Sequence, residues 1–175
     1  MSDPSSRRNF IVKSTSVATA AAVSSALVAC GGSDAPAAEF KYGIASGDPL
    51  ADRVMLWTHA KIADSTAVVG LTWQVASDSA FASILRSGRI ETSEATSFTA
   101  KVDVNGLTAG STYFYRFLDE AGTSSTLGIT RTLPAVNAAS VKFAVFSCAL
   151  YSEGFFNTYD AATKSDAQYA IHLGD

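Results

Sequence analysis

The chain has 175 residues, of which 47% are hydrophobic and 17% charged, enough to bury the core of one domain and begin another. Three of the 13 Lys and Arg residues and one of the 16 Asp and Glu residues precede Cys30, which leaves ten basic and fifteen acidic residues and a formal charge of −5. This acidic balance, with no Lys or Arg cluster after residue 13, argues against a nucleic-acid partner, which needs a basic footprint.

The first thirty residues are typical of a bacterial export signal. Residues 6–13 (SRRNFIVK) resemble a twin-arginine motif centred on Arg7 and Arg8. The moderately apolar residues 17–29 are too short to span a bilayer of about 30 Å and suit a signal peptide. Residues 27–30 (LVAC) resemble a lipobox, in which the chain is cut before Cys30 and that cysteine is lipidated.

These features predict a twin-arginine lipoprotein signal over residues 1–30. They imply two partners, the twin-arginine export machinery and a membrane to which the lipid anchor attaches the protein. The expected location is the cell envelope, on its periplasmic or extracellular face. Residues 31–39 are small, polar and breaker-rich, and predict a flexible tether between the anchor and the folded part.

Residues 40–134 carry the pattern of a β domain, in which short apolar or alternating runs are separated by turn residues. The expected strands cover residues 40–45, 53–59, 68–76, 84–90, 96–104, 112–119 and 125–132. This number of short strands over about 95 residues predicts an immunoglobulin or fibronectin III-like sandwich, so the expected fold class is mainly β. Trp57 and Trp73 are expected in the sandwich core.

One segment of this domain is more specific than the rest. Residues 104–116 (VNGLTAGSTYFYR) resemble the E–F corner of fibronectin type III domains. In that corner a leucine and a glycine precede a tyrosine whose hydroxyl bonds back to the corner backbone. Tyr113 would be that tyrosine, and its role would be structural.

The pattern changes after Pro134. Residues 141–147 form a continuous apolar run, residues 155–164 have helical spacing, and residues 169–173 form a second apolar run. Continuous apolar runs suit strands buried on both faces. Residues 140–175 are therefore expected to begin an α/β unit with two parallel strands joined by a helix.

Cys148 and Asp175 follow the two apolar runs and are the candidate metal ligands. Open α/β sheets place ligand sites at the carboxyl ends of their strands, and a thiolate with a carboxylate suits iron or zinc. Two ligands alone do not make a site. Cys148 could instead be a small buried hydrophobe and Asp175 a turn residue. His172 is expected to be a buried strand residue.

Four motifs together resemble the start of PhoD-type alkaline phosphatases. They are residues 42–49 (YGIASGDP), 53–58 (RVMLWT), 143–148 (FAVFSC) and 172–175 (HLGD). The resemblance implies an N-terminal β-sandwich followed by a calcineurin-like metallophosphatase domain. It also implies hydrolysis of phosphate monoesters and diesters outside the cytoplasm, at alkaline pH, with iron and calcium. By position, Cys148 matches the family's iron-ligating cysteine and Asp175 the aspartate that bridges the metals.

The family's later asparagine and histidine motifs are missing, and the chain has only two histidines, His59 and His172. We therefore expect the N-terminal portion of such an enzyme, with residues 140–175 a truncated start of the metallophosphatase domain, and no activity from this chain alone. The alternative is a surface lipoprotein whose sandwich binds a partner and whose tail is vestigial.

Overall fold

A computed structural model describes residues 36–136 and 138–174. The predicted signal residues Arg7, Arg8 and Cys30 lie outside this range, as does Asp175. Among the described residues, no helix has both the length and the apolar character needed to cross a membrane.

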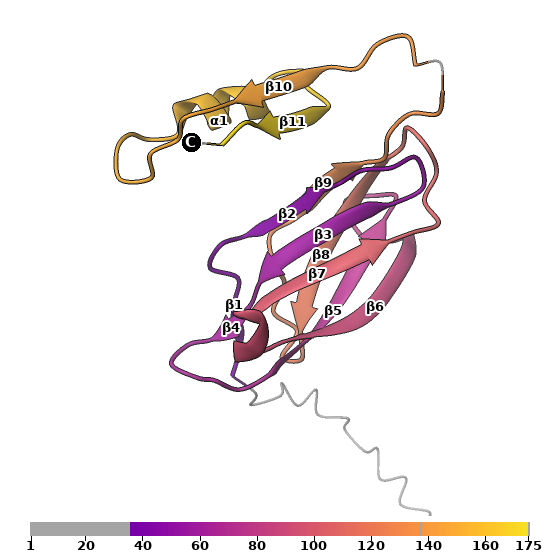
Figure 1. Ribbon diagram of the computed structural model, residues 1–175. Coiled ribbons are helices and arrows are strands. Elements are labelled where there is room, and N and C mark those ends of the chain that lie inside the picture. Colours follow the sequence, from indigo (N-terminus) through magenta and orange to yellow (C-terminus); the bar gives the residue numbers. More distant parts are fainter. Residues whose placement is uncertain (1–35, 137, 175) are drawn as a thin grey trace, which may run out of the picture. The chain divides into compact units, whose positions relative to one another are not determined.

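The described part of the chain is mainly β, as predicted (Figure 1). Its strands are β1 (Ala38–Glu39), β2 (Ile44–Gly47), β3 (Val54–His59), β4 (Lys61–Ile62), β5 (Val69–Ala76), β6 (Ile84–Thr92), β7 (Thr99–Val104), β8 (Thr112–Asp119), β9 (Gly128–Arg131), β10 (Phe143–Phe146) and β11 (Tyr169–His172). A short 3-10 helix (Glu94–Thr96) precedes β7, and α1 (Asn157–Thr163) joins β10 to β11.

Two antiparallel sheets form the layers of the predicted sandwich. One sheet has the strand order β2-β3-β7 and the other the order β6-β5-β8-β9. Their inward positions alternate along each strand, because successive side chains of a strand point to opposite faces. The core contains Leu56 from β3, Val102 from β7, Leu71 from β5 and Phe117 from β8, each buried. The three-plus-four arrangement confirms the fibronectin III-like fold class.

The structure corrects two details of the sandwich. The strand expected over residues 40–45 begins only at Ile44, because the chain first turns at Gly43, which has φ +66° and donates its N–H to the Phe40 carbonyl. The core position expected for Trp57 is also wrong. Trp57 is out of phase with the buried Val54 and Leu56 of β3 and lies on the opposite, half-buried face.

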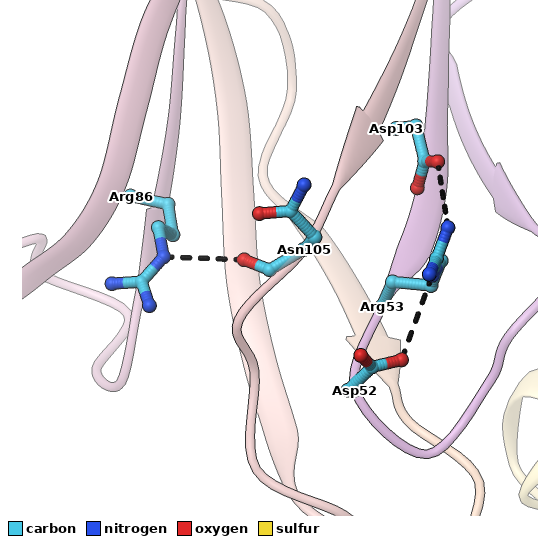
Figure 2. A network of polar contacts seen from close by, with 5 residues as sticks. All are labelled: Asp52, Arg53, Arg86, Asp103 and Asn105. Carbon is cyan, nitrogen blue, oxygen red and sulfur yellow. Dashed lines mark hydrogen bonds and ion pairs between the residues drawn. The ribbon is translucent and has the colours of Figure 1, made fainter.

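The E–F corner forms as predicted between β7 and β8. The Tyr113 side chain is buried, and its hydroxyl accepts a hydrogen bond from the Thr108 N–H at 2.7 Å. Arg86 of β6 contacts the backbone of this corner and donates from Nε to the Asn105 carbonyl at 3.2 Å (Figure 2). Its Nη2 also donates to the Gly106 carbonyl at 2.6 Å. Gly106 has φ +71°, a conformation that residues with a side chain rarely adopt, so the backbone favours glycine at this position.

On the other side of the close-up, Arg53 contacts two carboxylates (Figure 2). Its Nη1 lies 3.3 Å from Asp103 Oδ2, and its Nε lies 3.5 Å from Asp52 Oδ1. All three side chains are well exposed, so solvent screens these pairs and they contribute little to stability.

Strands β10 and β11 pair in parallel and α1 connects them, which confirms the predicted strand–helix–strand unit. The predicted burial of both strands is wrong. Phe143, Val145 and Ile171 are 51%, 59% and 41% exposed. The register places them on one face, whereas Phe146 and His172 share the other face and contact α1 through Tyr159. The apolar runs show what these strands can bury, and α1 lies against the face that carries Phe146 and His172.

Candidate metal edge

The candidate site lies at the edge where β10 and β11 end. Phe146 pairs with His172 at the last position of the parallel ladder. Beyond it, the Leu173 N–H bonds to the Phe146 carbonyl at 2.8 Å, and the Cys148 N–H bonds to the Gly174 carbonyl at 3.2 Å. The two chains therefore remain side by side past the strands. This brings Cys148 against the residue directly before Asp175.

The surroundings of Cys148 suit a ligand better than a core residue. The residue is exposed, so its interpretation as a small buried hydrophobe is wrong. It adopts φ +55°, a left-handed conformation that is uncommon for a residue with a side chain. Cys148 also lines a hollow between the end of β10 and α1, together with Glu153, Asn157 and Tyr159.

His172 is not the buried strand residue that the pattern predicted. It is exposed, and both of its ring nitrogens make hydrogen bonds. Nε2 lies 2.9 Å from the Tyr159 hydroxyl, and Nδ1 accepts the Gly174 N–H at 3.0 Å. The sequence pattern contained no signal for these contacts, because helical spacing over residues 155–164 does not say which strand residue a helix side chain meets.

The donors at this edge fit iron better than calcium. A thiolate is a soft ligand that favours transition metals, so the exposed Cys148 sulfur suits iron or zinc. Calcium takes six to eight oxygen ligands. Within residues 36–136 and 138–174, no group of three or more His, Cys, Asp or Glu side chains converges on one point. The described residues therefore supply a soft donor, Cys148, that suits a transition metal, and show no cluster of oxygen ligands that would suit calcium.

His59, the other histidine of the chain, lies far from this edge in the sequence and belongs to the sandwich. It ends β3, and its ring meets Tyr42 edge-on with 4.8 Å between ring centroids. Its Nδ1 is buried with no hydrogen-bond partner among the described residues. We assign it to the packing of the sandwich surface.

Comparison with known proteins identifies relatives over most of the chain. Residues 17–134 match the family described as "PhoD-like phosphatase, N-terminal domain". Alkaline phosphatase D of Bacillus subtilis (strain 168) is 34% identical over 144 residues, which are 78% of this chain and 24% of the relative. A solved structure described as "Structure of PhoD" is 33% identical, with a TM-score of 0.73 over 81% of this chain and 28% of that chain. The chain thus spans about a quarter of the curated relative.

Proposed function

This chain belongs to the PhoD-like phosphatase family, and from this premise we propose that it is the N-terminal portion of an exported, metal-dependent phosphatase. The proposed reaction is hydrolysis of phosphate monoesters and diesters at alkaline pH. The proposed organisation is a lipoprotein signal over residues 1–30, a tether over 31–39, the sandwich over 40–134 and the start of a metallophosphatase domain over 140–175.

The observation that carries this proposal is the parallel pairing of β10 and β11. Beyond the paired strands, the Cys148 N–H donates a hydrogen bond to the carbonyl of Gly174, the residue before Asp175. Thiolate and carboxylate donors suit a transition metal, and open α/β sheets place their ligand sites at the carboxyl ends of parallel strands. When bound, the metals would supply the polarisation of water and of phosphoryl oxygens that ester hydrolysis requires.

The role of the chain's own residues is to bind and orient. Cys148 would hold iron through its sulfur, with Asp175 as the second ligand. A catalytic site of this type needs more ligands than these two, and the chain contains only two histidines. We therefore propose that the 175-residue chain has no turnover by itself.

Metal binding and turnover test the two halves of this proposal separately. The purified chain should bind Co²⁺ with a thiolate-to-metal absorption band that Cys148→Ser abolishes and Asp175→Asn weakens. The same chain, supplied with iron and calcium at alkaline pH, should not hydrolyse an aryl phosphate. An unchanged band in Cys148→Ser would refute the ligand assignment, and clear turnover would refute the proposed inactivity.

The export proposal has its own test in cells. Arg7→Lys combined with Arg8→Lys should leave the unprocessed precursor in the cytoplasm, because twin-arginine transport reads this pair. Cys30→Ala should abolish incorporation of labelled fatty acid, since the acyl chains are joined through this cysteine. Normal processing of the Lys–Lys variant, or labelling of the Cys30→Ala variant, would contradict the proposal.

The reading frame beyond codon 175 tests the organisation. Continuation of the frame into further histidine motifs would support the phosphatase. A natural stop codon would favour the alternative, a surface lipoprotein whose sandwich is a binding module.

A further inference from the structure

His172 connects α1 to the turn that precedes Asp175. Its Nε2 lies 2.9 Å from the Tyr159 hydroxyl of α1, and its Nδ1 lies 3.0 Å from the Gly174 backbone nitrogen. Gly174 is two residues further along the chain, so the imidazole closes a ring of the kind that Asn and Asp side chains form in turns. One side chain thus joins the helix to the backbone at the edge of the parallel pair.

The hydrogen bond from Gly174 determines the tautomer of His172. A backbone N–H can only donate, so Nδ1 must be the acceptor and carry no proton. In the neutral imidazole the proton is then on Nε2, which donates to the Tyr159 oxygen. This assignment follows from the hydrogen-bond network, which is how a histidine tautomer is inferred.

Aromatic contacts orient the imidazole from both neighbouring elements. The rings of Phe146 and His172 are stacked, with centroids 6.4 Å apart and planes 21° from parallel. Tyr159 lies 4.9 Å from Phe146 and 6.2 Å from His172, centroid to centroid. The register produces this arrangement, because Phe146 and His172 are direct partners in the parallel ladder.

Both backbone polar groups of Gly174 are consequently hydrogen-bonded. Its N–H bonds to His172, and its carbonyl accepts the Cys148 N–H at 3.2 Å. Gly174 has φ +86°, a conformation that residues with side chains rarely adopt. The backbone conformation at Gly174 is therefore held by His172 on one side and by Cys148 on the other.

We propose that Tyr159 and His172 are positioning residues for the metal edge. Tyr159 holds the Nε2–H tautomer of His172, and His172 holds the Gly174 N–H while the Gly174 carbonyl accepts the Cys148 N–H, so that the backbone at Cys148 is fixed. The link to metal rests on the proposed function, because it takes Cys148 and Asp175 as the ligands. The row of hydrogen bonds from Tyr159 through His172 to Gly174, called the relay below, is observed among the described residues.

Three variants separate the two ends of the relay. His172→Asn retains an acceptor near the place of Nδ1, whereas His172→Gln retains a polar group near the place of Nε2. Tyr159→Phe removes only the hydroxyl. Tyr151→Phe is the matched control, because Tyr151 is 87% exposed and the described residues show no hydrogen bond to its hydroxyl.

The relay is first measured without metal, by nuclear magnetic resonance of the ¹⁵N-labelled chain. The His172 ring should show a protonated Nε2, an unprotonated Nδ1 and a scalar coupling from Nδ1 to the Gly174 amide. Tyr159→Phe should speed exchange of the Gly174 amide proton, whereas Tyr151→Phe should not. A proton on Nδ1, or exchange unaffected by Tyr159→Phe, would overturn the relay.

The positioning role is then measured by Co²⁺ affinity and by the thiolate band. Loss of a residue that orients a ligand typically weakens metal binding about 10–100-fold, and the exposure of His172 favours the lower end. His172→Gln should therefore weaken Co²⁺ binding about tenfold, and His172→Asn should restore most of it. Equal affinities in Gln, Asn and parent chains would overturn the role.

The two measurements distinguish failure of this inference from failure of the proposed function. If the parent chain shows no Cys148-dependent Co²⁺ band, the ligand assignment fails and the positioning role fails with it, while the resonance data still decide whether the relay exists. If the band is present and the variants leave it unchanged, the proposed function survives and the positioning role is refuted.

Discussion

Replacing Gly128 by alanine should destabilise the sandwich, because there is no room for a methyl group at this position. A Cβ on Gly128 would lie 2.3 Å from Tyr115 Cε1, 2.4 Å from Tyr115 Cζ and 2.7 Å from Ile44 Cδ1. Carbon atoms in contact are normally about 3.5–4.0 Å apart. Tyr115 is only 2% exposed and lies in the core cluster, so its ring cannot turn away into solvent.

The size of the effect follows from two opposing contributions. Overpacking a core costs about 1–3 kcal/mol, and an overlap of more than 1 Å with a buried ring places this site near the upper value. Alanine also reduces the entropy of the unfolded chain, which offsets about 0.4–1 kcal/mol. We expect a net loss of about 2 kcal/mol, which lowers the melting temperature of a domain this size by about 8–16 °C.

Urea unfolding of the chain, followed by tryptophan fluorescence, measures the free energy of unfolding. Gly47→Ala is the matched control, because Gly47 also lies in a strand but has nothing within 4 Å of an added Cβ. That variant should be unchanged or slightly stabilised. If Gly128→Ala proves as stable as Gly47→Ala, the edge strand β9 can move to accept the methyl group, and the argument from close packing is refuted.

Three further outcomes are expected. Tyr113→Phe should cost about 0.5–1.5 kcal/mol in urea unfolding by removing the bond to Thr108, with the exposed Tyr42→Phe as control. The N–H groups of Ala82 and Ser83 hold the pKa of Asp78 below its ordinary 3.8, so the ionised carboxylate stabilises the fold above that pH and this contribution is lost as the pH falls. Asp78→Asn should flatten this part of an acid-unfolding curve, and an unchanged curve would contradict the assignment. Burial raises the pKa of Tyr115 above 10.0, so the neutral phenol stabilises the fold below pH 10 and this contribution is lost as the pH rises further. Phenolate absorbance of Tyr115 that appears before alkaline unfolding would refute this expectation.

Local patterns predicted the sandwich well because alternation of apolar and polar residues indicates a strand with one buried face. Strand β8, expected over residues 112–119, has those bounds, and its inward positions Tyr113, Tyr115 and Phe117 are all buried. The pattern failed at Trp57, where the size and type of the side chain suggested the core but the register pointed it outward. Phase along the strand is the better guide, since each step of one residue reverses the face.

The sequence predicted which residues belong to the candidate site but not which contacts they make. The position of Cys148 after an apolar run predicted a residue at the carboxyl edge, and the parallel pairing places it there. That it would be exposed, in a left-handed conformation and bonded to Gly174, required the structure. The His172 contacts to Tyr159 and Gly174 likewise join elements whose separation in the sequence carries no periodic signal.

The sequence by itself determined the fold class, the tyrosine corner and the family, because each depends on residue types at short, fixed spacings. It also placed a cysteine and an aspartate after two strands that can pair. Only the tertiary structure decided which residues meet across that pair, because hydrogen bonds between β10, α1 and β11 depend on register and crossover geometry. The surfaces of β10 and β11 illustrate the same division. Their apolar residues reveal a capacity for burial, whereas their exposure depends on what the rest of the molecule packs against them.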